Sequence, residues 1–222
     1  MVNITETIRA ALDNKRIAGG VFVDLQKAFD TVNHEILLHK LNHYGIRGTV
    51  HDWFASYLSN RTQYVSLLGF ESNVLNIRHG VPQGSVLGPL LFLIYLNDLH
   101  KAIRYSKVYH FADDTNLLNI SDSPSKLQKQ LNRDLKLLYK WLLANKISLN
   151  CAKTEFIIFH KPGHKPDYDF KIKMNGHRVR PSDYIKYLGI YLDPTLSGNS
   201  HCEILTKKLT SKLIVDPPWK RK

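Results

Sequence analysis

Two short apolar runs that end in acidic residues constrain the fold of this chain more than any other feature. Residues 20–25 (GVFVDL) carry Asp24, and residues 109–114 (YHFADD) end on Asp113 and Asp114. Runs of this length, rich in β-branched and aromatic residues, are typical of buried strands. A carboxylate beside a buried strand is costly unless solvent or a cation neutralises it. We therefore expect either a metal site or, for Asp113 and Asp114, a solvated hairpin turn.

A divalent metal suits this pattern if the two strands are neighbours. Mg²⁺ prefers carboxylate oxygens and works together with substrate phosphates. Two such ions, about 3.5–4 Å apart, serve phosphoryl transfer in polymerases and nucleases. Adjacent strand ends at Asp24 and Asp113 would supply ligands for that chemistry.

The rest of the chain predicts one continuous α+β domain, without repeats or a long linker. Apolar residues at helical spacing predict helices at residues 3–14, 36–45, 50–60, 85–103, 123–145 and 201–215. Strands are expected at residues 20–25, 107–112, 115–120, 154–159 and 184–192, and hairpins around Gly69 and at Asn175-Gly176. The basic tail, residues 216–222, is expected to fray.

The charge favours a polyanionic partner. The 222 residues include 31 Lys and Arg against 19 Asp and Glu, a formal net charge of +12. Residues 151–222 hold 14 basic and 7 acidic residues, so the C-terminal third is the basic end. Basic side chains that neutralise phosphates release counterions, which makes nucleic acid a natural partner. A basic protein without such a partner is the alternative.

Membrane and secreted classes are not expected. The longest apolar stretch, residues 86–96, contains Gly88 and Pro89 and is well short of the roughly 20 residues of a membrane span. The N-terminus lacks the pattern of a secretory signal, and the two cysteines, Cys151 and Cys202, have neither disulfide-framework nor metal-type spacing. An intracellular location, in the nucleus or cytoplasm, is expected.

Five segments, in order, resemble the motifs of reverse transcriptases. They are residues 22–30 (FVDLQKAFD, motif A), 80–92 (GVPQGSVLGPLLF, motif B), 111–114 (FADD, motif C), 149–155 (LNCAKTE, motif D) and 187–192 (YLGIYL, motif E, the primer grip). Residues 28–34 (AFDTVNH) and 57–61 (YLSNR) make the chain most similar to non-LTR retrotransposons of the jockey type. The resemblance extends over residues 20–193.

This resemblance implies a polymerase palm, an antiparallel sheet packed on helices with a ferredoxin-like core. Residues 1–193 would form the palm, and residues 194–222 the start of a truncated thumb with a frayed basic tail. Only 23 residues precede Asp24, so the fingers are expected to be missing.

The resemblance also implies the metal ligands. Asp24, Asp113 and Asp114 would be catalytic and hold two Mg²⁺ ions, with Mn²⁺ as a substitute, and the backbone carbonyl of Leu25 would complete the site. Lys153 would protonate the pyrophosphate leaving group; without the motif, a lone lysine is more often a solvated surface charge.

The remaining site residues follow from the same resemblance. Phe29 would be the aromatic gate that excludes a ribose 2′-OH, although Phe alone is usually a core residue. Gln83 and Gly84 would lie against the templating base and the nucleotide. The primer grip would comprise Tyr187, Leu188 and Gly189.

The implied function is RNA-directed DNA polymerisation, with an RNA template, a DNA primer and dNTPs as partners. Missing fingers would make the isolated chain weakly active or inactive, because misplacement by about 1 Å can cost ~10²-fold in rate. One alternative is a non-catalytic, nucleic-acid-binding remnant of a retrotransposon. Another is an RNA-dependent RNA polymerase or a group II intron maturase, which share the palm; Phe29 argues against an RNA polymerase.

Overall fold

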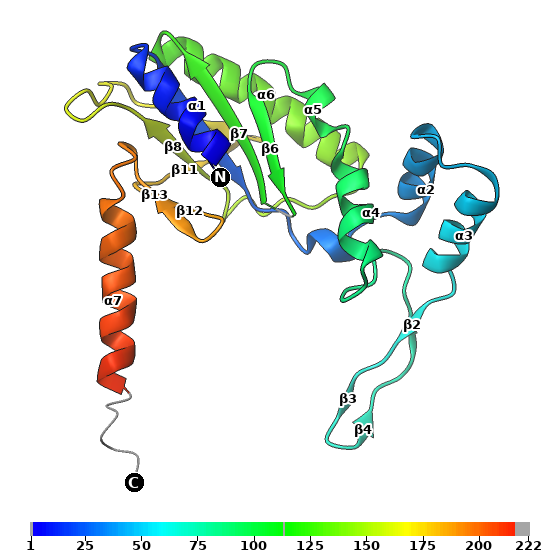
Figure 1. Cartoon of the computed structure of the whole chain (residues 1–222). Coiled ribbons are helices and arrows are strands. Elements are labelled where there is room, and N and C mark those ends of the chain that lie inside the picture. The colour runs from blue at the N-terminus through cyan, green and yellow to red at the C-terminus, as the bar shows by residue number, and fades with distance from the viewer. Residues whose placement is uncertain (1, 113, 216–222) are drawn as a thin grey trace.

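The chain folds around a five-stranded sheet in which β1 is the central strand (Figure 1). The computed structural model describes residues 2–112 and 114–215; Asp113, a predicted metal ligand, and the tail 216–222, predicted to fray, lie outside the described residues. The strand order is β11-β8-β1-β7-β6, formed by Arg180–Pro181, Glu155–Phe159, Ile17–Val23, Asp114–Ser121 and Lys107–Phe111. All pairs are antiparallel except β11 with β8. The predicted α+β class is confirmed.

Alternate residues of β1 face two different layers. The long helix α6 (Pro124–Ala144) packs on the face that carries Val21 and Val23, through a leucine stripe that is fully or almost fully buried. Ser123 caps this helix by accepting a hydrogen bond from the amide of Lys126. The opposite face, which carries Ala18, is covered by α1 (Val2–Asp13) and by β12. The helices predicted at both places are confirmed.

A buried carboxylate joins α6 to the start of β6. Asp134 is fully buried in α6 and accepts hydrogen bonds from three consecutive backbone amides, those of Arg104, Tyr105 and Ser106, the shortest at 2.6 Å. Three N–H donors satisfy a carboxylate that would otherwise be costly to bury. The contact fixes where the β6–β7 hairpin begins.

The segment between β1 and β6 lies beside the sheet and carries a projecting ribbon (Figure 1). Its elements are η1 (Ala28–Asp30), α2 (His34–His43), α3 (Gly48–Leu58), β2 (Thr62–Gln63), β3 (Ser66–Leu67), β4 (Phe70–Glu71), β5 (Leu75–Asn76), α4 (Leu87–Leu96) and α5 (Leu99–Ala102). The hairpin predicted around Gly69 is confirmed, as two short paired stretches, β2–β5 and β3–β4.

The single helix predicted at residues 85–103 is wrong. The structure has two helices, α4 and α5, separated at Asn97-Asp98, and α4 begins two residues after Ser85. The hydroxyl of Ser85 nevertheless accepts a hydrogen bond from the amide of Gly88 at 3.0 Å. The break lets Asp98 form an ion pair with a residue of another helix. The spacing of apolar residues within this segment cannot indicate such a contact.

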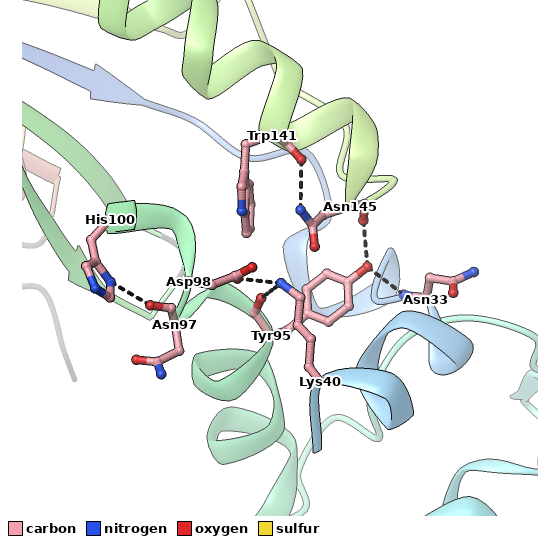
Figure 2. A network of polar contacts seen from close by, with 8 residues as sticks. All are labelled: Asn33, Lys40, Tyr95, Asn97, Asp98, His100, Trp141 and Asn145. Atoms are coloured by element: carbon pink, nitrogen blue, oxygen red, sulfur yellow. Dashed lines mark hydrogen bonds and ion pairs between the residues drawn. The ribbon is translucent and has the colours of Figure 1, made fainter. Parts of the chain in front are cut away.

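That partner is Lys40 of α2, at the centre of a polar network (Figure 2). The Lys40 ammonium lies 2.6 Å from the Asp98 carboxylate, donates to the carbonyl of Tyr95 at 2.5 Å, and lies over the rings of Tyr95 and Trp141. Burial lowers the pKa of Lys40, and Asp98 opposes this shift. The fully buried Tyr95 donates to the carbonyl of Asn145 at 2.6 Å. The network therefore joins α2, α4 and the end of α6.

The C-terminal part forms small hairpins and a helix. It contains β9 (Lys173–Met174), β10 (His177–Arg178), β12 (Ile185–Tyr187), β13 (Ile190–Leu192) and α7 (Asn199–Val215). The turn predicted at Asn175-Gly176 and the helix predicted at residues 201–215 are confirmed. The single strand predicted at residues 184–192 is wrong, because Leu188 and Gly189 adopt positive φ angles of 47° and 84° and turn the chain back.

Within residues 2–112 and 114–215, no helix combines the length and the apolar character that a membrane crossing requires.

The Lys40 network predicts a large loss of stability on Asp98→Asn. The substitution leaves a mostly buried ammonium without its counter-charge, which should lower the free energy of unfolding by about 2 kcal/mol. Urea unfolding followed by circular dichroism measures this difference. Asp122→Asn, which breaks exposed pairs with Arg16 and Lys126, is the matched control and should change stability far less, because solvent screens exposed pairs. Equal effects of the two substitutions would contradict the role of the network.

Candidate functional site

A cavity of about 170 Å³ lies on the sheet where β1 ends and β7 begins. It is lined by side chains from four separate segments of the chain: Phe22, Val23, Asp24, Leu25, Asp114, Asn116, Lys153, Glu155, Ile185, Lys186 and Tyr187. Parts of motifs A, C, D and E therefore meet at one place.

The pairing of β1 with β7 brings two acids together. Val23 is paired with Thr115, so the next step of the antiparallel register sets Asp24 opposite Asp114. Side chains that are directly opposite lie on the same face of a sheet. Asp24 is partly exposed and Asp114 is exposed, so both carboxylates reach the cavity from the open end of this face.

A loop after α6 brings Lys153 beside these acids. Leu25 forms an isolated antiparallel bridge with Leu149, in which Asn150 donates to the carbonyl of Asp24 at 2.9 Å and Gln26 donates to that of Ser148. The loop then turns tightly, because the hydroxyl of the buried Thr154 donates to the carbonyl of Asn150 at 2.9 Å. Lys153, within this turn, lines the cavity as an exposed side chain.

The β12–β13 hairpin closes another side of the cavity. The ring of Tyr187 packs edge-on against Phe22, with centroids 5.6 Å apart. Burial raises the pKa of the Tyr187 hydroxyl, and the charge of Asp114 adds to this shift. Leu188 and Gly189 form the turn of the hairpin and do not line the cavity.

The donor set of this cavity fits a divalent cation. Asp24 and Asp114 present carboxylate oxygens, the ligands that Mg²⁺ prefers. The bridge between Leu25 and Leu149 uses the carbonyl of Asp24, so it leaves the carbonyl of Leu25 for another partner. Among the described residues, no group of three or more His, Cys, Asp or Glu is arranged to hold a metal, and Asp113 lies outside those residues.

The predicted nucleotide and template residues lie apart from this cavity. Gln83 lines a second, larger cavity of about 830 Å³, and its side-chain amide donates to Asp30 at 2.7 Å. Gly84 lines neither cavity. Phe29 is partly buried with its ring 4.6 Å from that of Phe92, and also lines neither. The structure therefore unites Asp24, Leu25, Asp114, Lys153 and Tyr187, and separates them from the motif B residues.

Backbone hydrogen bonds fasten motif B to the segment after Asp24. Gly80 donates to the carbonyl of Val32 at 2.8 Å, and Val81 donates to that of Phe29 at 2.9 Å. Gly80 has a φ of 91°, and a Cβ there would lie 2.9 Å from the Cα of Asp30. Only glycine meets both conditions, so the approach of the two motifs depends on it.

The sequence interpretation missed three polar residues that line the cavity. Glu155 is a third acid, and Lys186 is a second lysine. Asn116 is 2% exposed, and its amide nitrogen has no hydrogen-bond partner among the described residues. Glu155 is the last residue of the segment that resembles motif D. Asn116 is two residues after Asp114, and residues two apart in a strand share one face, so this spacing could have indicated Asn116.

The chain matches one family along most of its length. The family model described as "Reverse transcriptase (RNA-dependent DNA polymerase)" matches residues 2–192. The RNA-directed DNA polymerase from mobile element jockey of Drosophila melanogaster is 31% identical over 211 residues, which cover 91% of this chain and 22% of that protein. The probable RNA-directed DNA polymerase from transposon BS of the same species is 31% identical over 223 residues, 95% of this chain and 24% of that protein. The chain thus spans about a quarter of these curated relatives.

Solved structures with a similar fold include telomerases. Telomerase from Candida albicans, in complex with the TWJ fragment of telomeric RNA, superposes with a TM-score of 0.57 at 14% identity, over 88% of this chain and 34% of that one. Apo telomerase from Candida tropicalis gives a TM-score of 0.57 at 13% identity, over 89% and 36%. At this level of identity, the likeness concerns the fold alone.

The hairpin that carries Asp114 should lose stability in mild acid. His110 of β6 bonds the hydroxyl of Thr115 at 3.1 Å, and burial, with a smaller effect of His100, lowers its pKa below 6.5. The unfolded chain then binds a proton to His110 at a higher pH than the folded chain does, so stability is lost as pH falls through 6.5 towards the folded pKa.

Urea unfolding at about pH 7.5 and 5.5 measures this loss. His110→Gln should show a smaller loss than the unsubstituted protein, and the exposed His177→Gln should behave like the unsubstituted protein. An unchanged pH dependence in His110→Gln would show that other groups cause it.

Proposed function

The chain belongs to the reverse transcriptase family, and we propose that it acts as the palm of an RNA-directed DNA polymerase. The reaction is attack of a primer 3′-OH on the α-phosphorus of a dNTP, directed by an RNA template. Residues 1–193 form the palm in this proposal, and residues 194–222, which include α7, begin the thumb.

The observation that carries this proposal is the meeting of Asp24 and Asp114 in one cavity with Lys153. Three segments far apart in the sequence supply them, and a solvated hairpin turn would not require Asp24 or Lys153 to be near Asp114. Two acids with a nearby lysine suit phosphoryl transfer, which depends on positioning and on neutralising negative charge.

Reverse transcriptases generally use divalent metal ions, and we propose two Mg²⁺ ions here, with Mn²⁺ as a substitute. Asp24, Asp114 and the carbonyl of Leu25 would hold them together with Asp113. When bound, such ions lower the pKa of the attacking hydroxyl and neutralise the charge of the leaving group.

The predicted site residues that are not metal ligands would contact the substrates in this proposal. Lys153, which lines the cavity, would give a proton to pyrophosphate, and Tyr187, with Leu188 and Gly189, would hold the primer end. On the motif B side, Gln83 and Gly84 would contact the templating base. Phe29, supported by Phe92, would close the space that a ribose 2′-OH needs.

We propose that the chain, which spans about a quarter of its curated relatives, is a weak catalyst on its own. The ribbon and α7 extend away from the sheet as separate arms (Figure 1). Contacts that position the template and primer in the longer relatives would be fewer in this span, and loss of positioning is costly in rate.

Primer extension with Asp24→Asn tests the function. With poly(rA)/oligo(dT), dTTP and Mg²⁺ under single-turnover conditions, the unsubstituted chain should extend slowly, and Asp24→Asn should reduce the rate by ~10²-fold or more. Asp169→Asn, at an exposed acid that does not line the same cavity as Asp24, is the control and should extend like the unsubstituted chain.

Equal extension by Asp24→Asn and the unsubstituted chain would remove the enzymatic proposal and favour the non-catalytic, nucleic-acid-binding alternative. Rapid extension by the isolated chain would overturn the proposal of weak activity alone. Efficient use of rNTPs in place of dNTPs would contradict the role of Phe29.

A further inference from the structure

An exposed aromatic column runs along α3 towards the second cavity. The rings of Trp53 and Tyr57 are stacked, with centroids 5.3 Å apart and planes at 12°. The guanidinium of Arg61, beyond the end of the helix, lies 5.4 Å from the centre of the Tyr57 ring. Residues four apart share one helix face, so the three side chains form one continuous stack.

Tyr57 is partly buried and packs against the hydrophobic core, whereas Trp53, at the other end of the stack, lies outside the core. The side chain of Trp53 is 51% exposed, whereas Trp141, which packs in the core, is 9% exposed. The Tyr57 ring fixes the orientation of the Trp53 indole, and half of the indole remains exposed. A planar group can stack on that exposed surface.

The second cavity, into which the column leads, is basic. Its lining includes Lys27, Arg61, Arg78 and His79, and Asp30 is the one acid in that lining. The Asp30 carboxylate already accepts a hydrogen bond from Gln83. Arg61 belongs both to the column and to the cavity, so the aromatic surface and the basic surface are continuous.

We propose that Trp53, Tyr57 and Arg61 form a stacking platform that, with the basic cavity, binds single-stranded nucleic acid. A base stacks on Trp53, while the phosphates of the same strand contact Arg61, Arg78 and Lys27. Stacked aromatic rings beside a positively charged groove are the arrangement that binds unpaired strands without sequence preference. The identity of the bound strand rests on the proposed function. If the chain acts as a reverse transcriptase palm, the strand is the unpaired template RNA before it reaches Gln83.

The cavity offers neutral donors and acceptors as well as charge. The amides of Gln63 and Asn76, from the paired strands β2 and β5, line it beside Arg61. Such groups suit base edges and sugar hydroxyls, and a base can also stack on Trp53, which the carboxylates of an acidic peptide cannot do. The chemistry therefore favours a nucleic acid over an acidic protein.

Binding of fluorescently labelled twelve-nucleotide oligo(U) and oligo(dT) to the full chain, without metal, primer or dNTP, tests this proposal. Trp53→Ala and Arg61→Gln should each weaken binding about tenfold, and Arg61→Gln should lower the salt slope by about 0.7. Tighter binding of oligo(U) identifies RNA as the strand, and tighter binding of oligo(dT) identifies DNA; either result supports the platform. Arg133→Gln is the matched control, because Arg133 lies over Tyr105 in a similar exposed pair that lines neither cavity.

Intrinsic fluorescence gives a readout that a purely structural role would not change. Saturating oligo(U) should quench the Trp53 emission, and Trp53→Phe should keep most of the affinity while losing this quenching. Equal weakening by Arg61→Gln and Arg133→Gln, unchanged binding by Trp53→Ala, or equally tight binding of polyglutamate would each overturn the proposal. Because no extension is measured, loss of binding is distinguishable from failure of the polymerase proposal.

Discussion

The antiparallel register of β1 with β7 is the constraint on which the candidate site depends. It pairs Val23 with Thr115 and so sets Asp24 opposite Asp114 at the end of the sheet. A slip of one residue would move each of these side chains to the other face, where α6 packs. The buried valines of β1 and the leucines of α6 resist that slip, because it would break their packing against each other. The hydrophobic core therefore determines where the two acids meet.

A second constraint holds the motif B side to the sheet. Lys40 joins α2 to Asp98, Tyr95 and Trp141 within one partly buried network (Figure 2). Gly80 and Val81 add backbone hydrogen bonds to the segment that follows Asp24. Because both sets of contacts cross between segments, they hold the motif B segment, which lines the basic cavity, against the segment that follows Asp24.

The sequence predicted the elements that carry strong local signals. Asn175-Gly176, Ser123 and the leucine stripe of α6 act over a few residues, and each predicted its turn or helix. The broken helix at Asn97-Asp98 was not predicted, because its cause is a lysine on another helix. The acids were recognisable as strand ends, whereas Asn116 and Glu155 joined them only through strand pairing. The separation of Gln83 from the acids likewise depends on tertiary packing.

The central claim, that Asp24 and Asp114 form a divalent-metal site, is tested most directly by Mn²⁺ binding followed by electron paramagnetic resonance. The account predicts that the full chain binds Mn²⁺, that Mg²⁺ competes for the same site, and that Asp24→Asn and Asp114→Asn each abolish this binding while Asp122→Asn does not. Identical Mn²⁺ binding by all four proteins, or none by the unsubstituted chain, would contradict it.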